Sequence, residues 1–382
     1  MSYNSADDII GDGFMKAILL FPACSALVGF ALFAGGAGSG KHPADGRGLA
    51  WNRQGAAAYL DKRTESWIHG MGAIDHGTFC VSCHTGLPYA ASRGSLRAGL
   101  GERGLSATES ELVASVTKRV RMWGEVQPFL SGLAESRGTE SVLNALVLVT
   151  YDGGKAILGP DTQKALDIMW EQQFKTGPNS GAWPWFSLGN EPWEAPDSQY
   201  WGAALAATAI GSAPRRYLAD PKIQVNVRLL KEYLNRGLHD QTGLNKLALL
   251  SASTKMPGLL PEAEQRLIIT EVLAKQHSDG GWSAGELLGP TWRRHDGTPQ
   301  DSRSDGYGTG FVAFTLEQAG LKSGQSELKR GLAWLVDHQD HSTGGWPGYS
   351  LNTKRDPSSD VGQFMNDAAT SYAVLALTNG GL

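Results

Sequence analysis

Apolar residues recur with helical spacing along the later half of the chain. Ile269, Val272 and Leu273 lie at i, i+3 and i+4, and Leu328 and Leu332 begin a similar run at i and i+4. This period is typical of an amphipathic helix with one face in a core. The pattern therefore predicts helices rather than strands in this half of the chain.

A second helical segment follows each amphipathic segment. The segments at 203–207, 308–313 and 368–373 are small and apolar on most faces, which is typical of a buried helix. An aspartate precedes each second helix and a glycine ends it, as N-cap and C-cap residues commonly do. These pairs are Asp197 with Gly211, Asp305 with Gly320, and Asp367 with Gly380.

Three further pairs of segments complete a set of six helical hairpins. They are 54–68 with 87–100, 111–123 with 139–149, and 223–234 with 244–252. An open array of repeats needs polar capping repeats at its ends, whereas the last segment here is as apolar as its counterparts. We therefore predict an all-α fold, an α/α toroid with amphipathic first helices outside and apolar second helices inside.

The repeats carry a short motif of glutamine, glycine and tryptophan. Gln276, Gly280 and Trp282 form one copy, Gln339 and Trp346 bound another, and a looser copy runs over 172–183. The motif resembles the tryptophan–glutamine repeats of squalene and hopene cyclases, whose toroid is shared by protein prenyltransferase β-subunits. The resemblance implies that the toroid covers 54–380, that Gln and Trp tie hairpins together, and that the central cavity takes an isoprenoid or another apolar small molecule.

The chain departs from both families at their catalytic residues. It lacks the Asp-x-Asp-Asp cluster of the protonating cyclases, and only Asp305 and Asp367 stand at comparable helix starts, each without an acidic neighbour. A lone carboxylate has little reason for a raised pKa. The zinc ligands that prenyltransferase β-subunits carry on inner helices are also missing. Asp305 and Asp367 remain the candidate catalytic acids.

Cys80, Cys83 and His84 form a Cys-x-x-Cys-His motif. This is the signature of covalent haem c attachment, in which both thiols bond the haem and the histidine ligates the iron. Zinc is a weaker alternative because it needs more ligands, and a redox dithiol would want a βαβ unit. The motif, in a loop at 80–84, replaces the loop of the first repeat, so we expect the haem at a rim or mouth of the ring.

The sixth ligand of the haem iron stays open in the sequence. His69, Met71, His76 and Met122 are the nearby candidates. A distal Met or His would make an electron-transfer centre, and an open position would permit ligand or peroxide chemistry. Core packing for the methionines and loop polarity for the histidines are the simpler interpretations.

Other clusters allow a structural or a functional interpretation. Aromatic residues gather at 183–201 and either pack the repeat or line a cavity. Glu191, Glu194 and Asp197 lie in the same stretch as possible rim acids. Loops at 292–296 and 352–356 carry basic residues, and long insertions on one face of a repeat protein often form its binding face.

The N-terminus has the layout of a secretory signal. Lys16 precedes an apolar run at 17–33, and small residues follow at 34–37; a retained anchor is the alternative, although the run is just under spanning length. We expect 1–37 to be a signal peptide or N-terminal membrane anchor, and 38–382 to be the toroid domain. The protein would be exported, either periplasmic or anchored facing the periplasm, with membrane contact only through this segment.

Composition narrows the function further. The net charge of −4 without a basic cluster argues against nucleic acid as a partner. The third cysteine, Cys24, lies in the apolar run, so Cys80 and Cys83 are the cysteines left for the exported body, which excludes a disulfide framework.

The leading hypothesis is an exported haem c protein that transfers electrons with a redox partner protein, or oxidises a substrate in the apolar ring cavity. If it is an enzyme, a haem-dependent oxidoreductase is the first expectation. The alternative is a terpene cyclase-like or isoprenoid-binding enzyme, and a non-enzymatic binding ring is a third possibility.

Overall fold

The protein is described by a computed structural model over residues 50–130 and 133–382. The described unit, Trp51–Leu382, consists of helices and loops, and its β pairing is limited to two isolated bridges. The predicted all-α class is confirmed. The predicted signal or anchor at 1–37 lies outside the described residues, and among the described helices none is both long and apolar enough to span a membrane.

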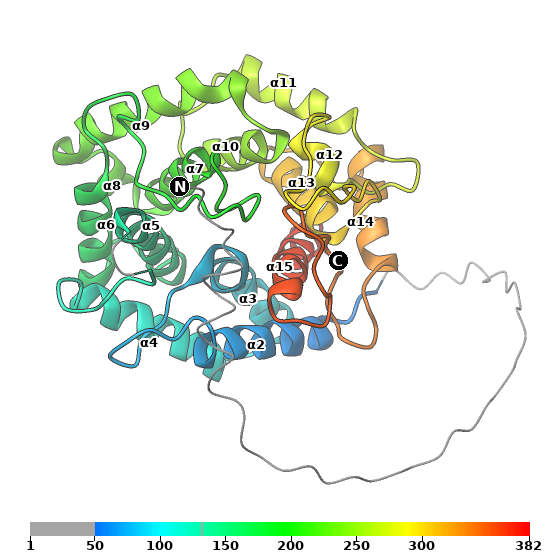
Figure 1. Ribbon diagram of the computed structural model, residues 1–382, viewed down its shortest axis with the longest axis horizontal. Helices are drawn as coiled ribbons and strands as arrows, with labels where there is room; N and C mark the ends of the chain where they lie inside the picture. The colour runs from blue at the N-terminus through cyan, green and yellow to red at the C-terminus, as the bar shows by residue number, and fades with distance from the viewer. Residues whose placement is uncertain (1–49, 131–132) are drawn as a thin grey trace, which may run out of the picture. The chain divides into compact units, whose positions relative to one another are not determined.

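Six amphipathic helices form the outer layer of this unit (Figure 1). They are α2 (Arg53–His69), α4 (Ala107–Arg121), α6 (Pro160–Gln172), α9 (Gln224–Gly237), α11 (Glu262–Leu273) and α14 (Ser326–Asp337). Several have well-defined starts. In α4, for example, Ser106 and Glu109 form a reciprocal capping box, which satisfies backbone N–H groups at the helix start.

Six further helices form the inner layer, and each follows an outer helix in the chain. They are α3 (Leu87–Leu100), α5 (Ala134–Tyr151), α7 (Ser198–Ser212), α10 (Gly243–Lys255), α13 (Gly306–Gln318) and α15 (Phe364–Asn379). Each inner helix contacts the next in this order, and α15 contacts α3. The inner layer is therefore a closed ring, as Figure 1 shows.

The inner helices are buried because both of their sides meet protein. Every residue of α13 from 306 to 313 is buried, and α5 is buried along most of its length. The outer helices bury one stripe only, as in α14. Short helices lie in the connections: α8 (Arg215–Leu218), α12 (Ala284–Leu288), η2 (Pro221–Ile223), η3 (Leu238–Asp240) and η4 (Val361–Gln363).

The glutamines of the third, fifth and sixth hairpins each join their own hairpin to the next one. The Nε2 atom of Gln173 donates to Asn226 O at 3.1 Å in α9, and that of Gln276 donates to Glu327 O at 2.7 Å in α14. Gln339 closes the ring, because its amide accepts from Asn52 N at 2.7 Å and donates to Asn52 O at 3.0 Å. The same side-chain contact thus repeats between consecutive hairpins and across the seam between the last and the first.

The repeat tryptophans hold each hairpin together internally. Trp183, Trp282 and Trp346 are fully buried, and each Nε1–H donates to a carbonyl near the end of its own outer helix, at 2.6, 2.8 and 2.6 Å. The indole therefore fills the gap between loop and helix while its one polar group stays paired.

One of the three predicted aspartate caps is wrong. The sequence places Asp367 before the last inner helix, whereas α15 begins at Phe364 and Asp367 lies inside its first turn. The polar residues Gln363 and Asn366 around this start hide the boundary from a pattern of apolar positions. Asp305, in contrast, is the N-cap of α13, and its carboxylate accepts from Gly308 N at 2.8 Å.

Glu317, near the end of α13, yields a prediction about pH and stability. Neither of its carboxylate oxygens has a hydrogen-bond partner among the described residues, and burial raises the pKa of this carboxyl from 4.5 to about 8. Between these two values the unfolded chain has lost a proton that the folded protein still holds, so stability falls as pH rises through that window. We expect Glu317→Gln to raise the melting temperature at pH 8 and to change it little near pH 4.

The control for this prediction is Glu262→Gln, because the Glu262 side chain is 86% exposed. Thermal melts of both variants at the two pH values measure the effect. An equal change for Glu317→Gln at pH 4 and pH 8 would contradict the argument from burial.

Candidate functional site

The Cys-x-x-Cys-His motif is buried at the start of an inner helix. Ser82–Gly86 form one π-helical turn, η1, that runs directly into α3. Ser82 adopts a positive φ of 61°, and its hydroxyl accepts from Thr85 N at 3.2 Å and Gly86 N at 3.0 Å. The sequence places the motif in a loop, whereas Ser82–Gly86 form a buried helical turn that contacts α3 and α15.

The imidazole of His84 is held by aromatic rings on two sides. Phe364 stacks on it with ring centroids 3.6 Å apart and planes at 19°, and Trp67 meets it edge-on at 5.0 Å. Trp193 lies 5.9 Å away on a third side. The orientation of the ring is therefore set by packing before any ligand is considered.

A chain of hydrogen bonds determines which nitrogen of His84 carries the proton. Thr85 Oγ1 donates to Asp367 Oδ2 at 2.7 Å, so this hydroxyl accepts from His84 Nδ1 at 2.8 Å. Asp367 can accept because Arg63 donates to both of its oxygens. The proton lies on Nδ1, and the Nε2 lone pair has no hydrogen-bond partner among the described residues.

The electrostatics keep this imidazole neutral. Burial and the nearby Arg63 charge lower the pKa of His84 from 6.5 to about 3. Metal-binding histidines usually donate their second N–H to a carboxylate, a carbonyl or a water, which fixes the tautomer and raises ligand basicity. A neutral ring with a free Nε2 and a fixed Nδ1–H is the form that ligates iron.

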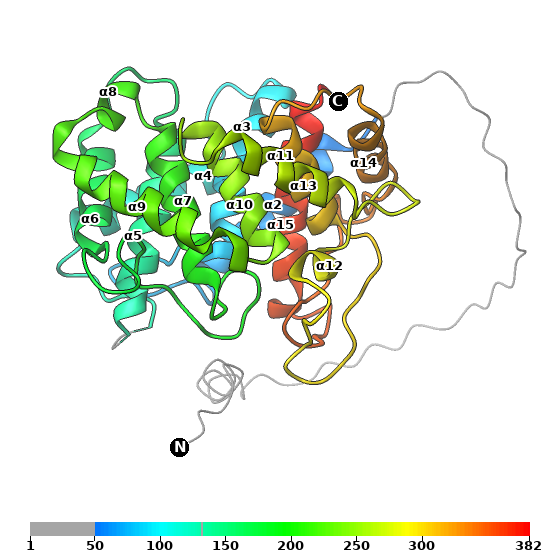
Figure 2. The same ribbon diagram turned by 90° about the horizontal axis from the view of Figure 1, so that it is seen from above.

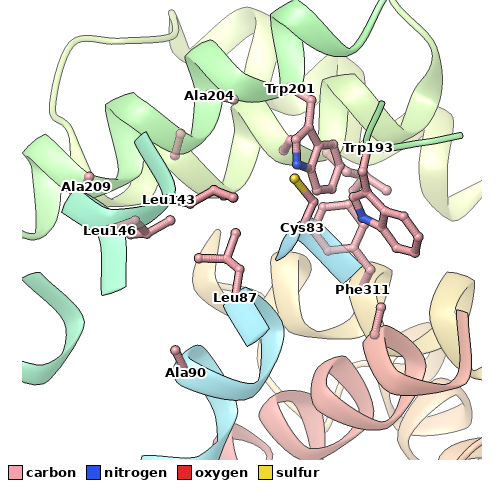
Figure 3. Close-up of a cluster of buried hydrophobic side chains, with 14 of the residues drawn as sticks. Cys83, Leu87, Ala90, Leu143, Leu146, Trp193, Trp201, Ala204, Ala209 and Phe311 are labelled. Atoms are coloured by element: carbon pink, nitrogen blue, oxygen red, sulfur yellow. The ribbon is translucent and has the colours of Figure 1, made fainter. Parts of the chain in front are cut away.

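The two thiols lie in the apolar centre. Figure 3 shows Cys83 among Trp193, Trp201, Leu87 and Phe311, all members of the buried core. Burial raises the pKa of Cys83, and the negative charge of Glu194 adds to this rise. Cys80 is also buried with its pKa raised, and both cysteines are free.

The environment of the thiols favours neither zinc nor a redox dithiol. Both alternatives use thiolates, which need nearby positive charge or metal. Among the described residues, no group of three His, Cys, Asp or Glu side chains converges as a metal site. The donors that are present, two cysteines with two residues between them and an adjacent neutral imidazole, are the donor types that covalent haem attachment uses.

A small cavity lies beside His84, with a volume of about 30 Å³. His84, Glu191, Trp193, Asn352, Phe364 and Met365 are among the residues that line it. The residues suggested by the sequence as sixth ligands are elsewhere. His69 and His76 have exposed side chains that lie 3.4 Å from Glu111 and 2.9 Å from Asp75, respectively, and neither Met71 nor Met122 lines this cavity.

Met365, which sequence reasoning did not single out, lines this cavity beside His84. Its position at the head of the last inner helix, two residues before Asp367, was the available signal. The sequence alone does not show that this position is close to His84, because the two meet only when the ring closes and α15 contacts η1.

The two candidate acids are bound by donors of the protein itself. Asp305 accepts from Gly308 N and from Ala284 N at 2.7 Å, and burial raises its pKa to about 6. Burial also raises the pKa of Asp367, while the hydrogen bonds and charge of Arg63 oppose that rise. These contacts favour a structural role for both carboxyls.

The long loops meet over the cavity and form a cap, defined as residues 187–196, 292–300 and 350–356. His295 N donates to Asn352 O at 2.8 Å, and Asn352 Nδ2 donates to Gly189 O at 2.8 Å. His295 Nε2 lies 3.0 Å from the buried Glu191 carboxylate. The loops of the fifth and sixth hairpins extend from the same end of the helices in Figure 2.

Some aromatic residues of the third hairpin pack the repeat, and others contact residues of the candidate site. Trp183 and Trp185 donate to backbone carbonyls and serve packing. Trp193 contacts both His84 and Tyr307, and Trp201 contacts Phe311. Burial raises the pKa of Glu191, Glu194 and Asp197 in the same stretch.

Comparison with known proteins bears on the fold. A solved structure described as a possible member of the GH105 family, from Salmonella enterica subsp. enterica serovar Paratyphi A, aligns with 89% of this chain and 96% of its own. The TM-score is 0.50 at 12% sequence identity, and that protein is itself an α/α toroid. The chain is an α/α toroid.

The toroid has no match among family models and none among the curated proteins. The α/α-toroid fold that the resemblance to squalene and hopene cyclases implied is therefore supported by the structural match, and the resemblance to those cyclases itself is not. At 12% identity, the structural match likewise establishes the fold of the toroid alone.

Proposed function

We propose that the toroid binds haem c covalently through Cys80 and Cys83, with His84 Nε2 as an iron ligand, and acts in redox chemistry. The observation that carries the proposal is the hydrogen-bond chain from His84 Nδ1 through Thr85 to Asp367. It prepares Nε2 to act as a ligand, and it does so at the one histidine that follows the two cysteines of the motif.

The haem, when bound, would supply one-electron redox chemistry. The chain's own residues hold and orient it. Thr85 and Asp367 keep the imidazole in the Nδ1–H form, Trp67 and Phe364 fix its plane, and the apolar wall around Cys83 excludes water. A redox partner protein would accept or deliver electrons at the capped end, or an isoprenoid-like apolar molecule would be oxidised in the ring.

The cap bears directly on how haem enters. The cavity of about 30 Å³ beside His84 is far smaller than a porphyrin. Attachment to the closed protein would therefore require the cap, with its contact between Glu191 and His295, to move away from the motif. Because haem c is joined to its protein outside the cytoplasm, we also propose that the protein is exported, with residues 1–37 as its signal or anchor.

The test is production of the full chain in a host that matures c-type cytochromes, followed by a pyridine haemochrome spectrum and intact mass. We expect one covalent haem per chain, none in Cys80→Ser/Cys83→Ser, and a disturbed iron spectrum in His84→Ala. His76→Ala is the matched control, because its side chain is exposed. A wild-type chain without covalent haem would overturn the proposal.

Glycoside hydrolysis is a second candidate, favoured by Glu191, which lines the cavity, and by Glu194 in the same loop. Burial raises the pKa of both carboxyls, and glycosidases pair an acid of raised pKa with a second carboxylate. This candidate predicts hydrolysis of aryl glycosides by the haem-free protein and its loss in Glu194→Gln. Failure to cleave a panel of such glycosides would remove it.

A further inference from the structure

The end of the ring opposite the cap exposes apolar side chains. It consists of connections from inner helices to outer helices, and we define this uncapped end as residues 101–106, 152–159 and 213–223. Figure 2 shows α8, which lies in the third of these connections, at the edge opposite the long loops of the fifth and sixth hairpins. Leu105 is 44% exposed and Ile157 is 63% exposed, so apolar side chains from two of the connections face solvent.

Three exposed arginines lie on the same end: Arg103, Arg215 and Arg216. None of them forms an ion pair with a residue that the structure describes. Arg216 and Ile157 line one groove, with a volume of about 640 Å³, so this positive charge lies beside an apolar side chain. Bases next to exposed apolar groups are the composition of surfaces that bind a membrane interface.

A second groove, with a volume of about 520 Å³, joins the first two connections. Leu105 and Lys155 line it from these two connections, together with Arg97 near the end of α3. Ser95 and Thr117 also line it, and neither hydroxyl has a hydrogen-bond partner among the described residues. The volume lies within the range of about 300–1,000 Å³ that is typical of small-molecule sites, so there is room for a polar head group.

The acids at and beside this end are already bound by donors of the protein. Asp220 accepts from Lys222 N at 2.9 Å, within its own turn. The others pair with bases: Glu102 with Arg93 at 2.7 Å, Asp152 with Lys155 at 2.6 Å, and Asp161 with Arg121 at 2.7 Å. Asp152 and Asp161 are the carboxylates that line the groove of about 520 Å³. The charge left without a partner at the uncapped end is therefore positive.

The chain enters the ring at the same end. A Cβ at Gly99, in the last turn of α3, would lie 3.7 Å from Arg53 Cδ, in the first turn of α2. The start of α2 is therefore beside the uncapped end. In the sequence, residues 34–50 separate the apolar run at 17–33 from Trp51, where the described unit begins. A bilayer that took up the apolar run would therefore meet this end of the ring first.

We infer that the uncapped end docks on the surface of an anionic phospholipid bilayer. The arginines would lie over the lipid phosphates, Leu105 and Ile157 would insert among the head groups, and the groove lined by Arg97 would take one head group. Attraction of basic residues to an anionic leaflet and burial of apolar area add to each other in this kind of binding. This docking surface goes beyond the proposed function and needs no haem. The capped end, with the candidate site, would face away from the bilayer and stay open to a partner protein.

The first experiment reconstitutes the full-length protein in vesicles and measures backbone hydrogen exchange. We expect slower exchange over 101–106 and 152–159 in an equimolar mixture of phosphatidylglycerol and phosphatidylcholine than in phosphatidylcholine alone. Exchange over 292–300, in the cap, should be the same in both, and high salt should reduce the difference at the uncapped end because it screens the charges. Equal exchange at the uncapped end in the two kinds of vesicle would overturn the inference.

A second experiment changes the docking surface while the N-terminal segment stays intact. In the mixed vesicles, Arg215→Glu/Arg216→Glu and Ile157→Asp should lower the ratio of docked to undocked protein, measured as the protection of 101–106, by about tenfold or more for the double charge reversal. Arg293→Glu and Leu133→Asp are matched controls, because both side chains are exposed outside the uncapped end.

Both sets of variants change exposed side chains, so their thermal melts should match that of the wild type. Wild-type protection in the charge-reversed protein would overturn the inference. Protection of the uncapped end by soluble polyglutamate, but not by the mixed vesicles, would also overturn it and would indicate an acidic protein as the partner.

Discussion

Gly344→Ala should be among the most destabilising single substitutions in the protein. Gly344 has a φ of 82°, and a Cβ there would lie 2.2 Å from the backbone carbon of Gly55, across the seam between the last hairpin and the first. An L residue at such φ costs about 1–2 kcal/mol, and a backbone clash that forces structure apart typically adds about 1–3 kcal/mol. We expect the free energy of unfolding in urea to fall by about 3 kcal/mol or more.

Gly320→Ala separates the two causes. Gly320 has a φ of 95°, but a Cβ there would meet nothing within 4 Å. It should therefore lose only the conformational cost of about 1–2 kcal/mol. Equal falls in the free energy of unfolding for the two variants would contradict this argument. They would mean that the backbone at the seam can move to accept a Cβ at no energetic cost, although Gln339 and Asn52 are joined there by two hydrogen bonds.

Asp367→Ala should destabilise the fold by a comparable amount. The carboxylate is 1% exposed and holds Arg63, itself 9% exposed, with an Nε to Oδ1 distance of 2.8 Å. Removal of one partner of a buried ion pair costs about 3–5 kcal/mol, and we expect the lower end of this range because Arg63 keeps its contact with the exposed Asp360. Denaturant unfolding of the variant measures the loss.

The same guanidinium supplies the control. Arg63 also pairs with Asp360 at 2.7 Å, but the Asp360 side chain is 59% exposed. Asp360→Ala should therefore cost less than about 1 kcal/mol. If Asp367→Ala were as mild as Asp360→Ala, and Asp367→Asn abolished turnover of a polyprenyl substrate, Asp367 would be an acid rather than a structural anchor.

The ring could be predicted from sequence because its signals are local. The glutamine, glycine and tryptophan of each motif lie within one short stretch, and their contacts recur in the third, fifth and sixth hairpins. The starts of helices could not be predicted well where the first turn contains polar residues. The helix that the sequence predicts from Thr139 in fact begins at Ala134. Its true start was missed because Glu135 and Arg137, in the first turn, interrupt the pattern of apolar positions.

The candidate site, too, contains residues that a local motif reveals and residues that only the folded structure brings together. Cys80, Cys83 and His84 are contiguous, so the motif is visible without a structure. Thr85 is adjacent, yet its hydroxyl matters only through Asp367, which lies 282 positions away. Met365 is hidden for the same reason: no local pattern reports that the last inner helix closes on the first.

Closure of the ring also constrains the order of events during biogenesis. The motif emerges early in synthesis, whereas the turn that covers it belongs to the last helix of the chain. Contacts of such long sequence separation form late in folding, because a large loop must first be closed. A maturation enzyme would therefore meet accessible thiols on a partly folded chain, and arrival of the final hairpin would seal the product. Under the proposed function, the rate at which the last hairpin docks would set the time during which the thiols can be reached without movement of the cap.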